Sequence, residues 1–233
     1  MNQYRFQKSS KIVSKLQLAD NVFYATIVDR SPTINIVLTK NHIDVEQFQS
    51  FLEQIETIRE YSPEKAQELS DTFFNYEQNT DLMATITGVV SEETAGELLL
   101  NSRYGDSEVP ILHINWVGSS PYYSGNRFGV LIMYILAKYC MDTKQIQFIT
   151  LDDDTDVRPI NVNHSGKVDN IYYLIGFKHK GRIGNSEYWK QWNPSNVTQG
   201  PERIISTGEF MSSREITQIQ SMYRGVPNLR VGI

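Results

Sequence analysis

The order of apolar and polar positions changes along the chain from a strand pattern to a helix pattern. Runs rich in β-branched residues at 21–29 and 33–39 predict two strands that form a hairpin. The next stretch places its apolar residues on one stripe of a helix: Val45, Phe48, Leu52 and Ile55. Asp44 is the predicted N-cap of this helix, with Gln47 three residues later as in a capping box.

A second amphipathic helix is predicted after Ser62, with Pro63 at its first helical position. Residues 81–104 then suggest two strands around a polar turn at 91–96. The run at 109–121 is almost continuously apolar, which is typical of a strand in the centre of a sheet. Two helices and several strands therefore precede the most apolar part of the chain.

That part is "SGNRFGVLIMYILAKYC" at 124–140, a small polar loop that opens a nearly unbroken apolar helix. A strand follows at 144–154 and ends in an acidic stretch. The loop has two interpretations. It is either a plain turn before a buried helix, or a backbone nest at a helix N-terminus that holds an anion such as a diphosphate. The glycine patterns of P-loop and dinucleotide-binding proteins are absent, which disfavours an unrelated nucleotide-binding domain.

The composition narrows the function classes. The chain has 233 residues, 40% of them hydrophobic, so it can bury a real core. A net charge of −5 argues against a nucleic-acid partner. The apolar run Val130–Ala137 is too short to cross a bilayer, so we expect no membrane partner. Cys140 is the single cysteine, which favours a reducing, cytoplasmic setting, and the histidines lack the spacing of a metal site.

After residue 193 the sequence becomes rich in turn residues. We expect one domain over 1–193, whose first part, 1–40, can hold extra N-terminal strands. Residues 194–233 are expected to form a C-terminal extension with one short helix, capped by Ser213.

The order strand, "YYSGNRFG", helix, strand, "LDDD" and "NIYYLIGF" resembles the GNAT superfamily of acyl-CoA-dependent N-acyltransferases, best over residues 82–192. Such proteins have a short helix that ends in a Tyr-x-x-x-Gly-Phe pattern, here Tyr172, Gly176 and Phe177, and then a closing hairpin, here at 178–192. The resemblance implies an α/β (α+β) fold: a mixed, mostly antiparallel twisted sheet flanked by helices.

The resemblance also implies that acetyl-CoA is the co-substrate. Its diphosphate would lie on the loop: Ser124, Gly125, Asn126, Arg127, Phe128 and Gly129. The family loop usually reads Gln/Arg-x-x-Gly-x-Gly/Ala, so Ser124 and Arg127 depart from it while Gly129 matches. Arg127 could donate to a phosphate, or crowd the loop because it cannot adopt a positive φ cheaply.

By resemblance, Trp116, Val117 and Gly118 on the central strand would hold the pantetheine arm; Trp116 is otherwise a core or rim residue. Tyr172 matches the position of the family's general acid and is otherwise a core aromatic. His113 is a conceivable base or a satisfied core histidine.

Asp152, Asp153, Asp154 and Asp156 end a strand and form either an acidic rim that attracts a cationic amine or an ordinary solvated strand end. The glycine and distal glutamate of an EF-hand are absent, which disfavours a calcium loop, and we expect no metal.

The sequence therefore predicts an N-acetyltransferase that moves an acetyl group from acetyl-CoA to a primary amine by direct attack in a ternary complex. The acceptor would be a small-molecule or protein amine, and a homodimer stays open. The alternative is a catalytically degraded GNAT-like domain that serves as a binding or structural protein.

Overall fold

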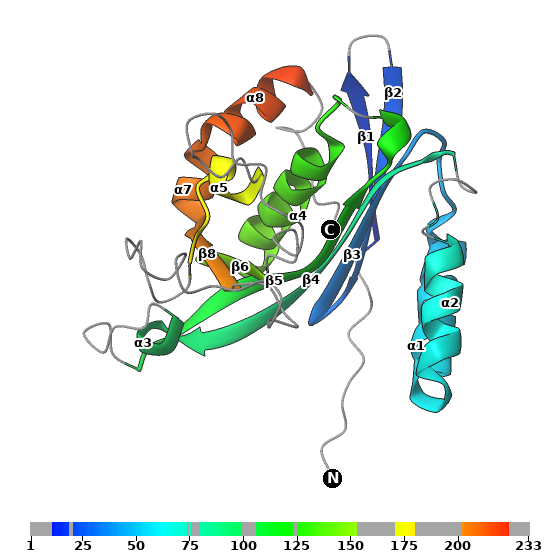
Figure 1. The fold of residues 1–233 in the computed structure, drawn as a ribbon, viewed down its shortest axis with the longest axis horizontal. Helices are drawn as coiled ribbons and strands as arrows, with labels where there is room; N and C mark the ends of the chain where they lie inside the picture. Colours follow the sequence, from blue (N-terminus) through cyan, green and yellow to red (C-terminus); the bar gives the residue numbers. More distant parts are fainter. Residues whose placement is uncertain are drawn as a thin grey trace, which may run out of the picture. The chain divides into compact units, whose positions relative to one another are not determined.

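The computed structural model describes residues 11–18, 21–73, 75, 80–98, 106–123, 125–152, 171–179 and 202–223. Its strands (Figure 1) are β1 (Lys11–Leu18), β2 (Asn21–Arg30), β3 (Thr33–Thr39), β4 (Leu82–Thr94), β5 (Glu108–Ser119), β6 (Phe148–Asp152), β7 (Lys178–His179) and β8 (Glu202–Ser206). Its helices are α1 (Val45–Tyr61), α2 (Pro63–Phe73), α3 (Ala95–Leu98), the 3₁₀ turn η2 (Pro121–Tyr123), α4 (Phe128–Lys144), α5 (Ile171–Ile175), α7 (Thr207–Ser212) and α8 (Arg214–Met222).

The described strands form one sheet in the order β1-β2-β3-β4-β5-β6-β8-β7. The pairs β1–β2, β2–β3, β6–β8 and β7–β8 are antiparallel, whereas β5 and β6 are parallel. The predicted class, a mixed and mostly antiparallel sheet flanked by helices, is confirmed. The predicted hairpin is β2–β3, with Arg30 opposite Thr33.

The chain divides into two compact units. The first comprises Met1–Gly88, Trp116–Leu136 and Ile219–Ile233, and the second comprises Val89–Asn115 and Ala137–Gln218. The predicted division at residue 193 stays a prediction.

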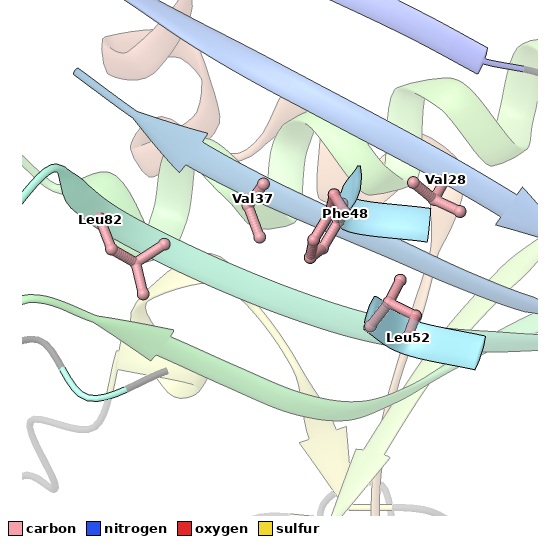
Figure 2. Packing of buried hydrophobic residues seen from close by; sticks show 5 residues of the cluster. All are labelled: Val28, Val37, Phe48, Leu52 and Leu82. Carbon is pink, nitrogen blue, oxygen red and sulfur yellow. The ribbon is translucent and has the colours of Figure 1, made fainter. Parts of the chain in front are cut away.

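Two opposite faces of β2 are covered in the first unit. Val28 belongs to a buried cluster with Val37, Leu82 and the α1 residues Phe48 and Leu52 (Figure 2). Phe23 lies an odd number of residues from Val28, so its side chain points to the other face. There its ring meets Phe128 of α4 edge-on, with centroids 5.4 Å apart. The first unit is therefore a helix–sheet–helix sandwich.

Local signals place the helices of this unit. The Asp44 carboxylate accepts hydrogen bonds from the main-chain N–H groups of Glu46 and Gln47, so the predicted N-cap of α1 is confirmed. α2 begins at Pro63 as predicted. None of the described helices is both long and apolar enough to cross a membrane.

Another buried cluster lies in the second unit. Leu98 of α3 packs there with Val109, Ile111 and Ile204. The predicted turn at 91–96 is wrong, because residues 91–94 continue β4 and 95–98 form α3. Residues 91 and 92 are exposed, so their polar side chains reflect a solvated strand end rather than a chain reversal.

The C-terminal segment holds more structure than the sequence indicated. α8 corresponds to the predicted helix, and the Ser213 Oγ accepts the Ile216 N–H at 3.4 Å. In addition, β8 lies between β6 and β7, and α7 follows it directly. Residues 202–206 therefore belong to the sheet.

Candidate functional site

The loop before α4 turns through two residues with left-handed backbone. Gly125 has φ 87° and Arg127 has φ 55°. At the start of α4 the Leu131 N–H donates to the Arg127 oxygen at 3.0 Å. The N–H groups of residues 128–130 precede that bond and have no partner within the helix. Ser124, the first residue of the predicted loop, lies outside the described residues.

Asn126 is held between these two residues. Its main-chain N–H and its side-chain Nδ2 both donate to the Tyr123 oxygen, at 3.3 and 3.1 Å. The Tyr123 hydroxyl donates to the Thr80 oxygen at 2.8 Å. The Asn126 oxygen accepts a hydrogen bond from the Tyr223 hydroxyl. The loop is thus fixed by residues that are distant in sequence.

The two glycines of the loop differ in whether their position requires glycine. Gly125 requires glycine because of its positive φ, although a Cβ there would meet nothing within 4 Å. At Gly129 a Cβ would meet the Ser119 Oγ at 3.7 Å, an ordinary contact. Internal packing therefore does not demand glycine at 129.

β5 extends beyond the region where it pairs with β6. The parallel register runs from Ile111 opposite Phe148 to Ile114 opposite Leu151, while β5 continues to Ser119. In that extension Trp116 is 60% exposed, so it is not a core residue. Val117 and Gly118 are half-buried. The end of β5 thus offers strand backbone beside the loop that begins α4.

The left-handed backbone of Arg127 leads to the first testable prediction. An Arg127→Gly variant should have a free energy of unfolding about 1 kcal/mol higher, because a non-glycine residue at positive φ costs roughly that much. Denaturant unfolding measures the change. Arg127→Ala is the matched control, since it removes the same side chain and keeps the strain. Equal stabilisation by Ala and Gly would show that the side chain, and not its backbone, is responsible.

The residues predicted for proton transfer lie in the second unit. The His113 Nδ1 is 2.9 Å from the Thr150 Oγ1, and Thr150 is fully buried. Thr150 fixes the orientation of the half-buried imidazole. This contact satisfies one ring nitrogen and is compatible with both interpretations of His113.

Tyr172 is buried, and its ring meets Phe177 edge-on at 6.0 Å. Its main-chain oxygen accepts hydrogen bonds from the N–H groups of Gly176 and Phe177, at 3.1 and 2.9 Å. Gly176 has φ 109°, so it ends α5 in the left-handed conformation. The Tyr-x-x-x-Gly-Phe pattern therefore has a structural cause in this chain, and the catalytic role of Tyr172 stays a prediction.

The acidic residues are described only in part. Asp152 is half-buried at the end of β6, opposite Glu202 in the β6–β8 register. Asp153, Asp154 and Asp156 lie outside the described residues. Among the side chains that the structure describes, no group of acids, histidines or cysteine could hold a metal ion.

Sequence reasoning missed Tyr123 and Tyr223 as residues that shape the loop. Tyr123 directly precedes the loop and reads as part of an ordinary turn. Tyr223 is 97 positions from its partner Asn126, so no local pattern could connect them.

No protein-family model matches the sequence, and no curated protein matches it. Solved structures do match. One is described as a bacterial toxin and is 15% identical to this chain. The match covers 62% of this chain and 66% of that chain, with a TM-score of 0.37. The chain thus spans slightly less than two thirds of that structure.

Two further matches have a TM-score of 0.38. AtaT complexed with acetyl-methionyl-tRNAfMet is 8% identical over 76% of this chain and 72% of that one. Arabidopsis thaliana NAA60 in complex with a bisubstrate analogue is 10% identical over 77% of this chain and 78% of that one. Within this chain, the predicted order of strand, loop, buried helix, strand and short helix is confirmed as β5, loop, α4, β6 and α5.

Proposed function

We propose that this protein is an N-acyltransferase that moves an acetyl group from acetyl-CoA to a primary amine. One observation supports this most: two left-handed residues, Gly125 and Arg127, turn the chain into the N-terminus of α4. That turn adjoins the extended end of β5, because a Cβ on Gly129 would lie 3.7 Å from the Ser119 Oγ.

A diphosphate suits this turn for three physical reasons. The N–H groups at the start of α4 and the positive end of its dipole attract an anion. Gly129 carries no side chain to block the approach of a ligand. The exposed Arg127 adds positive charge to the rim of the turn. In the proposal, Trp116, Val117 and Gly118 lie along the pantetheine arm.

Acetyl transfer needs a neutral amine, a stabilised oxyanion and a proton for the departing thiolate. The amine nitrogen attacks the thioester carbonyl, the C–N bond forms, and the C–S bond breaks. We assign the proton that the thiolate takes up to the Tyr172 hydroxyl, and the proton that the amine loses to His113 or water. These assignments rest on the family resemblance of Tyr172 and on the residue chemistry of His113.

Direct transfer follows from the position of the single cysteine. Cys140 lies in α4 and is fully buried. An acyl-enzyme would require its thiolate to reach the thioester carbonyl, which a buried thiol cannot do without opening the helix packing. The proposed reaction therefore takes place in a ternary complex.

The acceptor should be cationic, because acidic residues follow β6. We expect amines such as polyamines to outperform neutral or acidic acceptors, with KM rising as ionic strength rises. Changing Asp153 and Asp154 to Asn should raise KM for a polyamine more than it lowers kcat. Steady-state kinetics across a salt series measures both effects. A salt-independent KM, or an acidic metabolite as best acceptor, would contradict this assignment.

Thermal melting with and without acetyl-CoA tests the proposed function. Ligand that binds only the folded state raises its stability, by about 2.7 kcal/mol at a concentration of 100 Kd. S-acetylpantetheine, which has no diphosphate, should produce a smaller shift. An unchanged melting temperature at millimolar acetyl-CoA would favour the alternative, a degraded domain with a binding or structural role.

A further inference from the structure

Tyr223, just after α8, is fully buried and points its hydroxyl at the loop before α4. The hydroxyl donates to the main-chain oxygen of Asn126. Burial raises the pKa of Tyr223 to about 12, so the phenol remains protonated and a donor at any physiological pH.

Two aromatic rings that pack against Tyr223 fix the position of this hydroxyl. The Tyr223 ring meets Phe23 of β2 at 5.6 Å and Phe128 of α4 at 6.2 Å between centroids. Phe23 and Phe128 also meet each other. Because Phe128 is the first residue of α4, Tyr223 contacts both the loop and the helix that the loop begins.

The hydrogen bond has a consequence on the other side of the same peptide group. The Asn126 oxygen and the Arg127 N–H belong to one planar trans peptide, in which they point in opposite directions. By holding the oxygen toward the buried rings, Tyr223 directs the Arg127 N–H away from them. This peptide joins Asn126 to the left-handed Arg127.

We propose that Tyr223 is a positioning residue for acyl-CoA: its hydroxyl sets the peptide between Asn126 and Arg127 so that the loop faces the diphosphate. The inference rests on the proposed function and extends it, since it makes the C-terminal segment part of the cofactor site. Tyr223 does not touch the ligand in this proposal and acts through the loop.

Tyr223→Phe tests the proposal, because it removes the hydroxyl and keeps the ring contacts. We expect the Kd for acetyl-CoA to rise about three- to tenfold, the usual effect of one lost hydrogen bond. At saturating acetyl-CoA, kcat should be unchanged. The kcat/KM for S-acetylpantetheine should also be unchanged, because this substrate has no diphosphate to be positioned.

Gln220→Met is the matched control. Gln220 lies in α8, three residues before Tyr223, and its Nε2 donates to the Tyr134 hydroxyl of α4 at 3.2 Å, well past the loop. The Gln220→Met variant tests whether any weakened contact between α8 and α4 reduces the affinity for acetyl-CoA. We expect its Kd for acetyl-CoA to equal that of the wild type.

Amide hydrogen exchange provides a measurement without ligand. Exchange in residues 125–129 should be faster in Tyr223→Phe and unchanged in Gln220→Met. Equal exchange and equal Kd in Tyr223→Phe and wild type would overturn the positioning role alone. Equal losses in both variants would also overturn it, in favour of general helix docking. If the wild type fails to bind acetyl-CoA, the proposed function fails, and this inference fails with it.

Discussion

A Tyr172→Phe variant is expected to lose about 10²- to 10⁴-fold in kcat, the usual contribution of a positioned general acid. The substitution removes the proposed proton donor for the thiolate and keeps the ring that meets Phe177. Binding of acetyl-CoA should therefore change little. Steady-state kinetics gives kcat, and thermal melting with ligand reports binding.

Tyr173→Phe is the control for this variant. It removes a hydroxyl from the same short helix, α5, at a position rotated by about 100° from Tyr172. We expect its kcat to be close to that of the wild type. If Tyr172→Phe also keeps its kcat, Tyr172 is a core aromatic, as its burial allows.

Gly129→Asp is expected to abolish the rise in melting temperature that acetyl-CoA produces. The new carboxylate would face the proposed diphosphate across the first turn of α4, where like charges repel. Without ligand the fold should be preserved, because an acidic side chain in the first turn of a helix interacts favourably with the helix dipole. The variant thus separates ligand binding from folding.

Gly129→Ala shows what a Cβ alone does at this position. The atoms nearest to its methyl group would be those of the Ser119 side chain, at ordinary contact distance. We expect it to melt like the wild type without ligand and to keep part of the shift with acetyl-CoA. A full acetyl-CoA shift in Gly129→Asp would place the diphosphate elsewhere.

Elements with a strong local signal were predictable from the sequence. The N-cap Asp44, the start of α2 at Pro63 and the β2–β3 hairpin depend on neighbouring residues, and all three are confirmed. The end of a short helix at the Gly-Phe pair was implied by the resemblance, and α5 does end at Ile175, just before the left-handed Gly176.

Arg127 shows the limit of local reasoning. Its side chain disfavours a positive φ, yet the structure places it at φ 55°. Contacts on the preceding residue explain this, because Asn126 is bonded to both Tyr123 and Tyr223. Tertiary contacts can thus impose on one residue a conformation that its type disfavours.

Long-range pairing accounts for what the sequence did not predict. β8 enters the sheet between β6 and β7, although its five residues follow a turn-rich stretch. Its Ile204 packs in one cluster with the β5 residues Val109 and Ile111, which lie more than 90 positions earlier. Short strands of this kind have too few residues to show a period.

Amine-dependent release of the CoA thiol from acetyl-CoA tests the proposed activity most directly. With a polyamine as acceptor, we expect the rate to saturate in both substrates and to fall by at least about 10²-fold in Tyr172→Phe. The acceptor set should include small amines and a lysine peptide. Thiol release that does not depend on any amine, or no release by a protein that acetyl-CoA stabilises, would contradict an N-acyltransferase.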